Sequence, residues 1–128
     1  MRRPKPSSEA EQRYEADVAL AARREELLGA AREAENVFRQ AQGRWAPEAE
    51  LLRLAQDLDT ALTSAMRAAY AAQRAEIGPR GYDDRIFRRK AMATPRVHAL
   101  TAEAEHLLTL RETHRLNGIP AVPFEPAS

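Results

Sequence analysis

The chain has 128 residues, a formal net charge of +1 and no cysteine. This length corresponds to one domain, and the near-balance of charge gives no overall electrostatic argument for a nucleic-acid or membrane partner. The lack of cysteine excludes disulfides, thiol catalysis and cysteine-ligated zinc.

Alanine dominates the apolar composition, with 26 residues against 30 for Val, Ile, Leu, Met, Phe, Trp and Tyr together. Alanine is the best helix former, but a buried methyl-sized group contributes only about 0.8 kcal/mol. The composition therefore predicts long helices joined by a narrow apolar seam. We expect a second copy of the chain to complete that seam, so that the protein is a homo-oligomer.

The N-terminal residues follow their basic side chains with prolines and serines, without the apolar stretch of a secretory signal. No apolar run approaches the roughly 20 residues that a membrane-spanning helix needs. We therefore expect a cytoplasmic protein with no membrane partner.

The first long helix is predicted over residues 8–42, after a flexible basic arm at residues 1–7. Ser8 and Glu11 have the spacing of a capping box, and Gly43 is a suitable C-terminal stop. Apolar residues alternate at three- and four-residue spacings, which is typical of a coiled-coil seam, and only Arg24 interrupts them. The seam comprises Ala16, Leu20, Leu27, Ala31, Ala34, Phe38, Ala41 and Trp45.

A second long helix is predicted from Pro47 to the Gly78-Pro79 pair. The connection of about four residues favours an antiparallel hairpin. Trp45 lies in this connection, and its size leads us to expect that it covers the end of the hairpin. The seam and its turn supply our interface candidates, which are Leu20, Leu27, Phe38, Trp45, Leu51, Leu58 and Leu62.

Two further helices follow. Asp83 and Asp84 are suited to cap a short basic helix of about two and a half turns that begins at Arg85. Thr94-Pro95 predicts the start of a third long helix, which ends near Asn117-Gly118. The fold prediction is therefore all-α: a long antiparallel helical hairpin, a short basic helix and a third long helix, packed as a coiled-coil-like bundle of three to four helices.

The tail at residues 119–126 has proline at every third position, which favours an extended, polyproline-like conformation. Three outcomes stay open for this tail: packing back on the bundle, docking to a partner, or disorder. The domain prediction is thus an arm at residues 1–7, a helical domain at residues 8–117 and a tail at residues 118–128.

Residues 80–96 carry six basic and two acidic side chains. One interpretation is phosphate contact, with Tyr82 and Phe87 near enough to stack on bases. The other is a linker whose arginines pair with acidic faces of the two long helices. The candidate nucleic-acid-binding residues are Arg85, Arg88, Arg89 and Lys90, supplemented by Arg2, Arg3 and Lys5 of the arm.

Catalytic and metal signatures are weak. Glu103 and His106 share a helix face, but di-iron bundles need a second such motif and two further carboxylates. His98 and His114 lie eight residues to either side, which rotates each by about 80° around the helix. The serines lack a nucleophile elbow, and there is no glycine-rich phosphate loop. We expect no enzymatic activity, no metal and no cofactor.

These observations lead to two functional hypotheses. The first is a non-enzymatic helical interaction or assembly protein that acts through oligomerisation and a protein partner. The alternative is a nucleic-acid-binding accessory protein that uses residues 85–90 and the N-terminal arm.

Overall fold

The computed structural model describes residues 5–117, and all regular structure in this range is helical, as the sequence predicts. The expectations for Arg2, Arg3 and the tail at residues 118–128 lie outside the described residues. The elements are α1 (Ser8–Ala21), α2 (Arg24–Gly43), α3 (Glu48–Ile77), the 3-10 turn η1 (Pro79–Tyr82), α4 (Arg85–Met92) and α5 (Pro95–Asn117).

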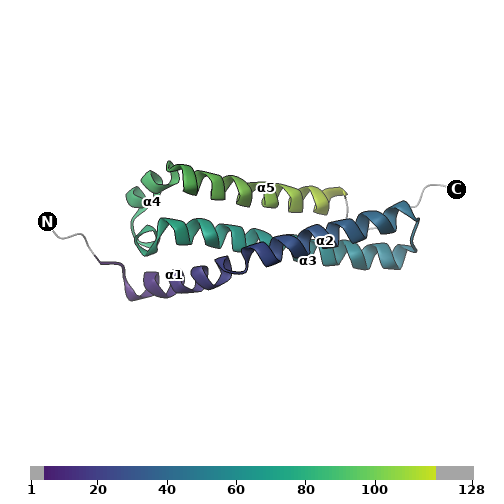
Figure 1. Cartoon of the computed structure of the whole chain (residues 1–128), viewed down its shortest axis with the longest axis horizontal. Helices are drawn as coiled ribbons and strands as arrows, with labels where there is room; N and C mark the ends of the chain where they lie inside the picture. The colour runs from purple at the N-terminus through teal and green to yellow at the C-terminus, as the bar shows by residue number, and fades with distance from the viewer. Residues whose placement is uncertain (1–4, 118–128) are drawn as a thin grey trace.

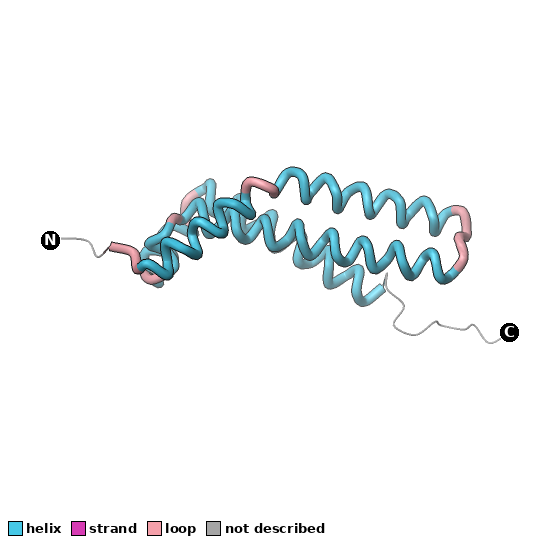
Figure 2. The backbone as a smooth tube through the Cα atoms, turned by 90° about the horizontal axis from the view of Figure 1, so that it is seen from below, coloured by secondary structure: helices cyan, strands magenta, loops and turns pink. Residues whose placement is uncertain are grey.

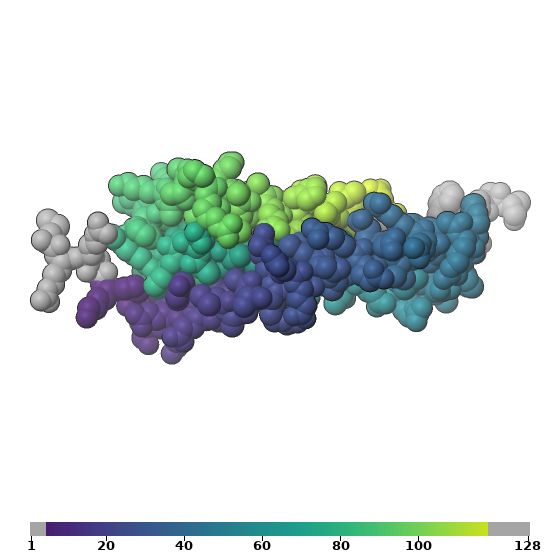
Figure 3. Space-filling model, in the orientation of Figure 1, coloured from purple at the N-terminus to yellow at the C-terminus, as the bar shows by residue number. Residues whose placement is uncertain are grey.

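The longest helix, α3, is the central element (Figure 1). α1 and α2 follow one another along one side of α3, and α5 returns along another side, antiparallel to α3. η1 and α4 make the turn between α3 and α5 at one end, and the α2–α3 turn forms the other end (Figure 2). The resulting body is elongated, as the space-filling view shows (Figure 3).

The core is a narrow seam centred on α3. Its α3 residues recur every three or four positions, which places them on one helix face. Phe38 of α2 and Leu107 of α5 pack against this face, with exposed fractions of 6% and 5%. The α3 members are Ala55, Leu58, Leu62, Ala65 and Ala69. Thus α5 supplies part of the cover that the composition led us to expect from a second chain.

The interface candidates divide by burial. Phe38, Leu58 and Leu62 are buried in the chain's own core, and Leu27 and Leu51 pack against it while half-buried. Leu20 is also half-buried. Trp45 alone among them is almost fully exposed. Any surface that these candidates offer to a partner is therefore concentrated at Trp45.

The predicted single helix over residues 8–42 is broken at Ala22 and Arg23, which is a correction to the sequence analysis. The Arg23 N–H donates to the Leu20 carbonyl at 3.0 Å, a three-residue step that tightens the end of α1. Arg24 then leaves the seam and pairs with Glu103 of α5. The axes of α1 and α2 can therefore point in different directions along α3 (Figure 2).

The helix caps also differ in part from the sequence analysis. Ser7, rather than Ser8, caps α1, since its backbone is extended and its hydroxyl accepts the Ala10 N–H at 3.0 Å. Asp84 caps α4 by accepting the Phe87 N–H at 2.9 Å, as expected. Asp83 instead accepts the Ser7 N–H at 2.8 Å. Asp83 thus ties the start of α1 to the α3–α4 connection.

Candidate functional site

The turn between α2 and α3 is the first candidate surface. The Ala46 N–H donates to the Ala41 carbonyl at 3.0 Å, and the Trp45 N–H donates to the Gln42 carbonyl at 3.2 Å. This pair of hydrogen bonds defines a Schellman motif. Glycine usually occupies the left-handed position of this motif. Here that position is Trp45, with a φ of 57°.

The indole of Trp45 does not cover the end of the hairpin, contrary to the sequence prediction. Its exposed fraction is 91%. In a Schellman motif the apolar contact belongs to the residue after the left-handed one. Ala46 accordingly is buried, as is Ala41, and these two alanines close the end of α2.

Trp45 is unfavourable for the chain's own stability. A bulky residue in the left-handed region is an outlier, and the conformation costs about 1–2 kcal/mol. The exposed indole buries too little surface to offset this cost. Strained residues cluster at functional sites, so an observed outlier of this kind points to a role outside the monomer's fold.

Among the described residues, the hairpin end around Trp45 has fewer helices side by side than the rest of the body. His114, in the last turn of α5, bonds the Ala55 carbonyl through Nε2 at 2.7 Å. The first turns of α3 therefore extend past the end of α5 (Figure 1). Leu52, in this part of α3 beyond the end of α5, is 37% exposed. Arg44 and Glu50 form an ion pair beside the turn.

The opposite end of the molecule carries the basic helix α4, which is the second candidate surface. Arg85, Arg88, Arg89 and Lys90 are all exposed. None forms an ion pair with another residue in 5–117, whereas nine arginines elsewhere in that range do. The expectation that these arginines pair with the long helices is therefore wrong within the described chain.

The two aromatic side chains expected to stack on bases are already engaged. Phe87 lies under the guanidinium of Arg80, whose carbon is 4.7 Å from the ring centroid. Tyr82 donates its hydroxyl hydrogen to the Asp17 carboxylate. Both rings are half-buried. Base stacking on these rings would require them to leave their present contacts.

The structure separates the predicted basic residues. Lys5 and Arg85 line one open pocket, together with Asp83 and Asp84. Arg88 lines a different pocket, and Arg89 and Lys90 line neither. The basic set is therefore spread around α4 rather than gathered at one point.

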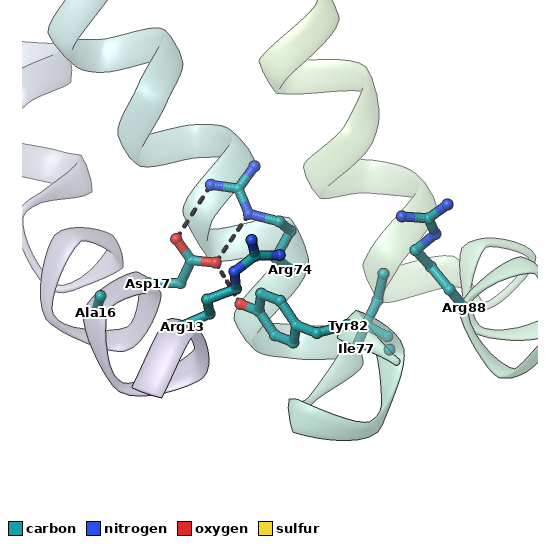
Figure 4. A pocket seen from close by; sticks show the side chains of 8 residues that line it. Arg13, Ala16, Asp17, Arg74, Ile77, Tyr82 and Arg88 are labelled. Atoms are coloured by element: carbon teal, nitrogen blue, oxygen red, sulfur yellow. Dashed lines mark hydrogen bonds and ion pairs between the residues drawn. The ribbon is translucent and has the colours of Figure 1, made fainter. Parts of the chain in front are cut away.

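The pocket that includes Arg88 was missed by sequence reasoning. It has a volume of about 380 Å³ and lies between α1, the end of α3, η1 and α4 (Figure 4). Its charged members come from positions far apart in the sequence, so only the folded chain assembles them. The lining residues are Arg13, Ala16, Asp17, Arg74, Ile77, Gly81, Tyr82 and Arg88.

Asp17 organises one wall of this pocket. It accepts hydrogen bonds from Arg74 Nε at 2.8 Å and Nη2 at 3.1 Å, and another from Tyr82. Burial is the largest single effect and opposes ionisation of Asp17. The hydrogen bonds and the positive charges of Arg74 and Arg13 together outweigh it, so the pKa of Asp17 stays below its ordinary value of 3.8. Burial and the bond to Asp17 raise the pKa of Tyr82 above its ordinary value of 10.0.

The acidic and histidine residues considered for a metal do not converge. Glu103 pairs with Arg24, while His98 and His106 are exposed. Across residues 5–117 no group of three acidic or histidine side chains is placed to hold a metal ion. In the same range, no helix combines the length and apolarity required to cross a bilayer. Comparisons with protein-family models, curated proteins and solved structures find no match for this chain.

Proposed function

We propose that this chain is a non-enzymatic assembly protein that self-associates through the tip of the α2–α3 hairpin, with Trp45 as the anchor. The observation that carries the proposal is the left-handed, 91% exposed indole at that tip. Tryptophan is among the residues that most often dominate binding energy at protein interfaces. Its strain in the free chain is accounted for if the indole becomes buried in the assembled state.

A second copy of the chain is the occupant that the tip favours. A two-fold interface must be self-complementary, and the tip offers an exposed apolar anchor beside charges of both signs in Arg44 and Glu50. Within residues 5–117, only α2 and α3 form the molecule at the first turns of α3, which matches the narrow seam expected from the composition. Two tips packed antiparallel would thicken the same part of the seam in both copies.

Trp45 is the only tryptophan, so its fluorescence reports directly on this site. We expect the emission of the wild-type chain to shift to shorter wavelength as protein concentration rises, because association buries the indole. Ile86→Ala is the matched control, since Ile86 is 70% exposed at the opposite end of the molecule. Emission that stays at the fully exposed position up to high concentration would end the self-association proposal.

Nucleic-acid binding through α4 is the second candidate function. It is favoured by the four exposed basic side chains of α4 that have no ion pair within the described chain. Binding of this kind rests on phosphate contacts and weakens steeply with salt. We expect a salt-dependent mobility shift with DNA or RNA that Arg85→Gln, Arg88→Gln and Arg89→Gln together abolish. No shift at low salt would exclude this candidate.

A further inference from the structure

We propose that the pocket between α1, the end of α3, η1 and α4 binds a small organic phosphate, held between Arg13 and Arg88 over Ile77. This site is separate from the hairpin tip and independent of the assembly proposal. Its volume of about 380 Å³ lies within the roughly 300–1,000 Å³ of typical small-molecule sites.

The charge of the lining favours an anion. Three guanidinium groups come from three different helices, namely Arg13 of α1, Arg74 of α3 and Arg88 of α4, against one carboxylate, Asp17. Arg74 is matched by Asp17 through two hydrogen bonds. Arg13 and Arg88 therefore carry the excess positive charge of the pocket.

Both of these arginines are available to a ligand. Arg88 has no ion pair with any residue in 5–117. Arg13 contacts Glu9 at 3.3 Å, but both side chains are largely exposed. Exposed pairs of this kind contribute little to stability, so a ligand can readily replace Glu9.

Asp17 does not repel an anion strongly, because the positive charge of Arg74 lies directly against its carboxylate. It accepts both Arg74 hydrogen bonds and the Tyr82 hydroxyl hydrogen. Figure 4 shows these three side chains together, with Arg13 beside them and Arg88 on the far side of Ile77. The pocket thus presents two separated cations with an apolar surface between them.

This arrangement selects the ligand class. Two separate guanidinium groups match a dianion better than a single carboxylate, and the arginine fork suits the oxygens of a phosphate. Ile77 is buried, and η1 lies tight against it, since a Cβ on Gly81 would come 2.5 Å from Ile77 Cγ2. The apolar floor favours a phosphate that carries a small organic group over inorganic phosphate.

Calorimetric titration at constant ionic strength tests the proposal, with inorganic phosphate, phenyl phosphate and benzoate as probes. We expect saturable binding in the order phenyl phosphate, inorganic phosphate, benzoate. Arg13→Gln and Arg88→Gln should each weaken phenyl phosphate binding by about tenfold, the effect of losing one charge-assisted contact. Circular dichroism checks that both variants, altered at exposed side chains, remain folded.

Arg89→Gln is the matched control, because Arg89 is exposed on the same helix but does not line the pocket. Its affinity for phenyl phosphate should equal that of the wild type. Equal losses in Arg88→Gln and Arg89→Gln would show a diffuse electrostatic effect and overturn the site. Non-saturable binding, or benzoate binding as tightly as phenyl phosphate, would overturn it as well.

Discussion

Asp17 of α1 and Arg74 of α3 form a two-point ion pair, with N–O distances of 2.8 and 3.1 Å, that fixes α1 against the end of α3. The Asp17 side chain is 13% exposed, so solvent screens this pair only in part. This ion pair, the Tyr82 hydroxyl and the Ser7–Asp83 contact together hold α1, which ends at the break at Ala22 and Arg23, against the end of α3 and η1.

Replacing Asp17 should therefore loosen α1. We expect Asp17→Asn to lower the free energy of unfolding by about 1–2 kcal/mol, because charge-assisted hydrogen bonds are lost from Arg74, whose side chain is partly screened by water. Urea denaturation followed by circular dichroism measures this. An unchanged midpoint would mean that the pair contributes nothing to the docking of α1.

The same residue predicts a pH dependence. The pKa of Asp17 is held below its ordinary value of 3.8 in the folded chain, as is that of Asp59, chiefly through its hydrogen bond from Arg115. The unfolded chain thus takes up protons at higher pH than the folded chain. The stabilisation is complete above the ordinary carboxyl pKa and is lost as pH falls through the lowered values.

We therefore expect thermal stability to be constant near neutral pH and to fall below about pH 4–5. Asp17→Asn should fall less steeply than the wild type over the same range. A wild-type stability that rises on acidification would contradict the assigned ion pairs.

Arg24 and Glu103 join α2 to α5, and both side chains are 26% exposed. A double-mutant cycle with Arg24→Ala and Glu103→Ala should give a coupling energy of about 1 kcal/mol. Arg23, directly before α2, and Glu26, in its first turn, form an exposed pair that is the matched control. The coupling energy of this control pair should be no more than a few tenths of a kcal/mol. Equal coupling energies for the two pairs would show that the lower exposure of the Arg24–Glu103 pair does not strengthen it.

Replacing glycine by alanine should have opposite effects on stability at Gly81 and Gly29. Gly81→Ala should destabilise the chain by about 1–3 kcal/mol, because the new Cβ would meet Ile77 Cγ2 at 2.5 Å. Gly29→Ala should stabilise it by about 0.5–1 kcal/mol, because Gly29 lies within α2 and a Cβ there meets nothing within 4 Å. Thermal unfolding of the two variants compares them directly, and the same sign for both would contradict the packing around η1.

The sequence predicts the helix boundaries where a residue type acts locally. The helix α3 begins directly after Pro47 and ends directly before Gly78, and α5 begins at Pro95. Proline fixes its own φ, and glycine readily adopts the positive φ of 97° found at Gly78. The break at Ala22 and Arg23 carries no such signal, since alanine and arginine both favour helix. Only Arg24, an arginine within an apolar seam, hints at it.

The candidate sites are harder to predict because they depend on the sign of the φ angle at one residue and on contacts between helices. The size of Trp45 indicates a buried residue, and Gly43 is the residue that the sequence predicts as the C-terminal stop of the first long helix. The structure places the left-handed conformation two residues later and so turns the indole outward. Arg13, Asp17 and Arg74 look like ordinary surface charges until α1 and α3 bring them together.

Self-association through the hairpin tip is best tested with Trp45→Gly, by light scattering after size-exclusion chromatography together with urea denaturation. Glycine relieves the left-handed strain, so we expect the monomer to gain about 0.5–1 kcal/mol after allowing for glycine's greater freedom when unfolded. The wild type should show a concentration-dependent oligomer, and the more stable variant should stay monomeric. A wild-type monomer at all concentrations, or a variant that associates as well as the wild type, would contradict the account.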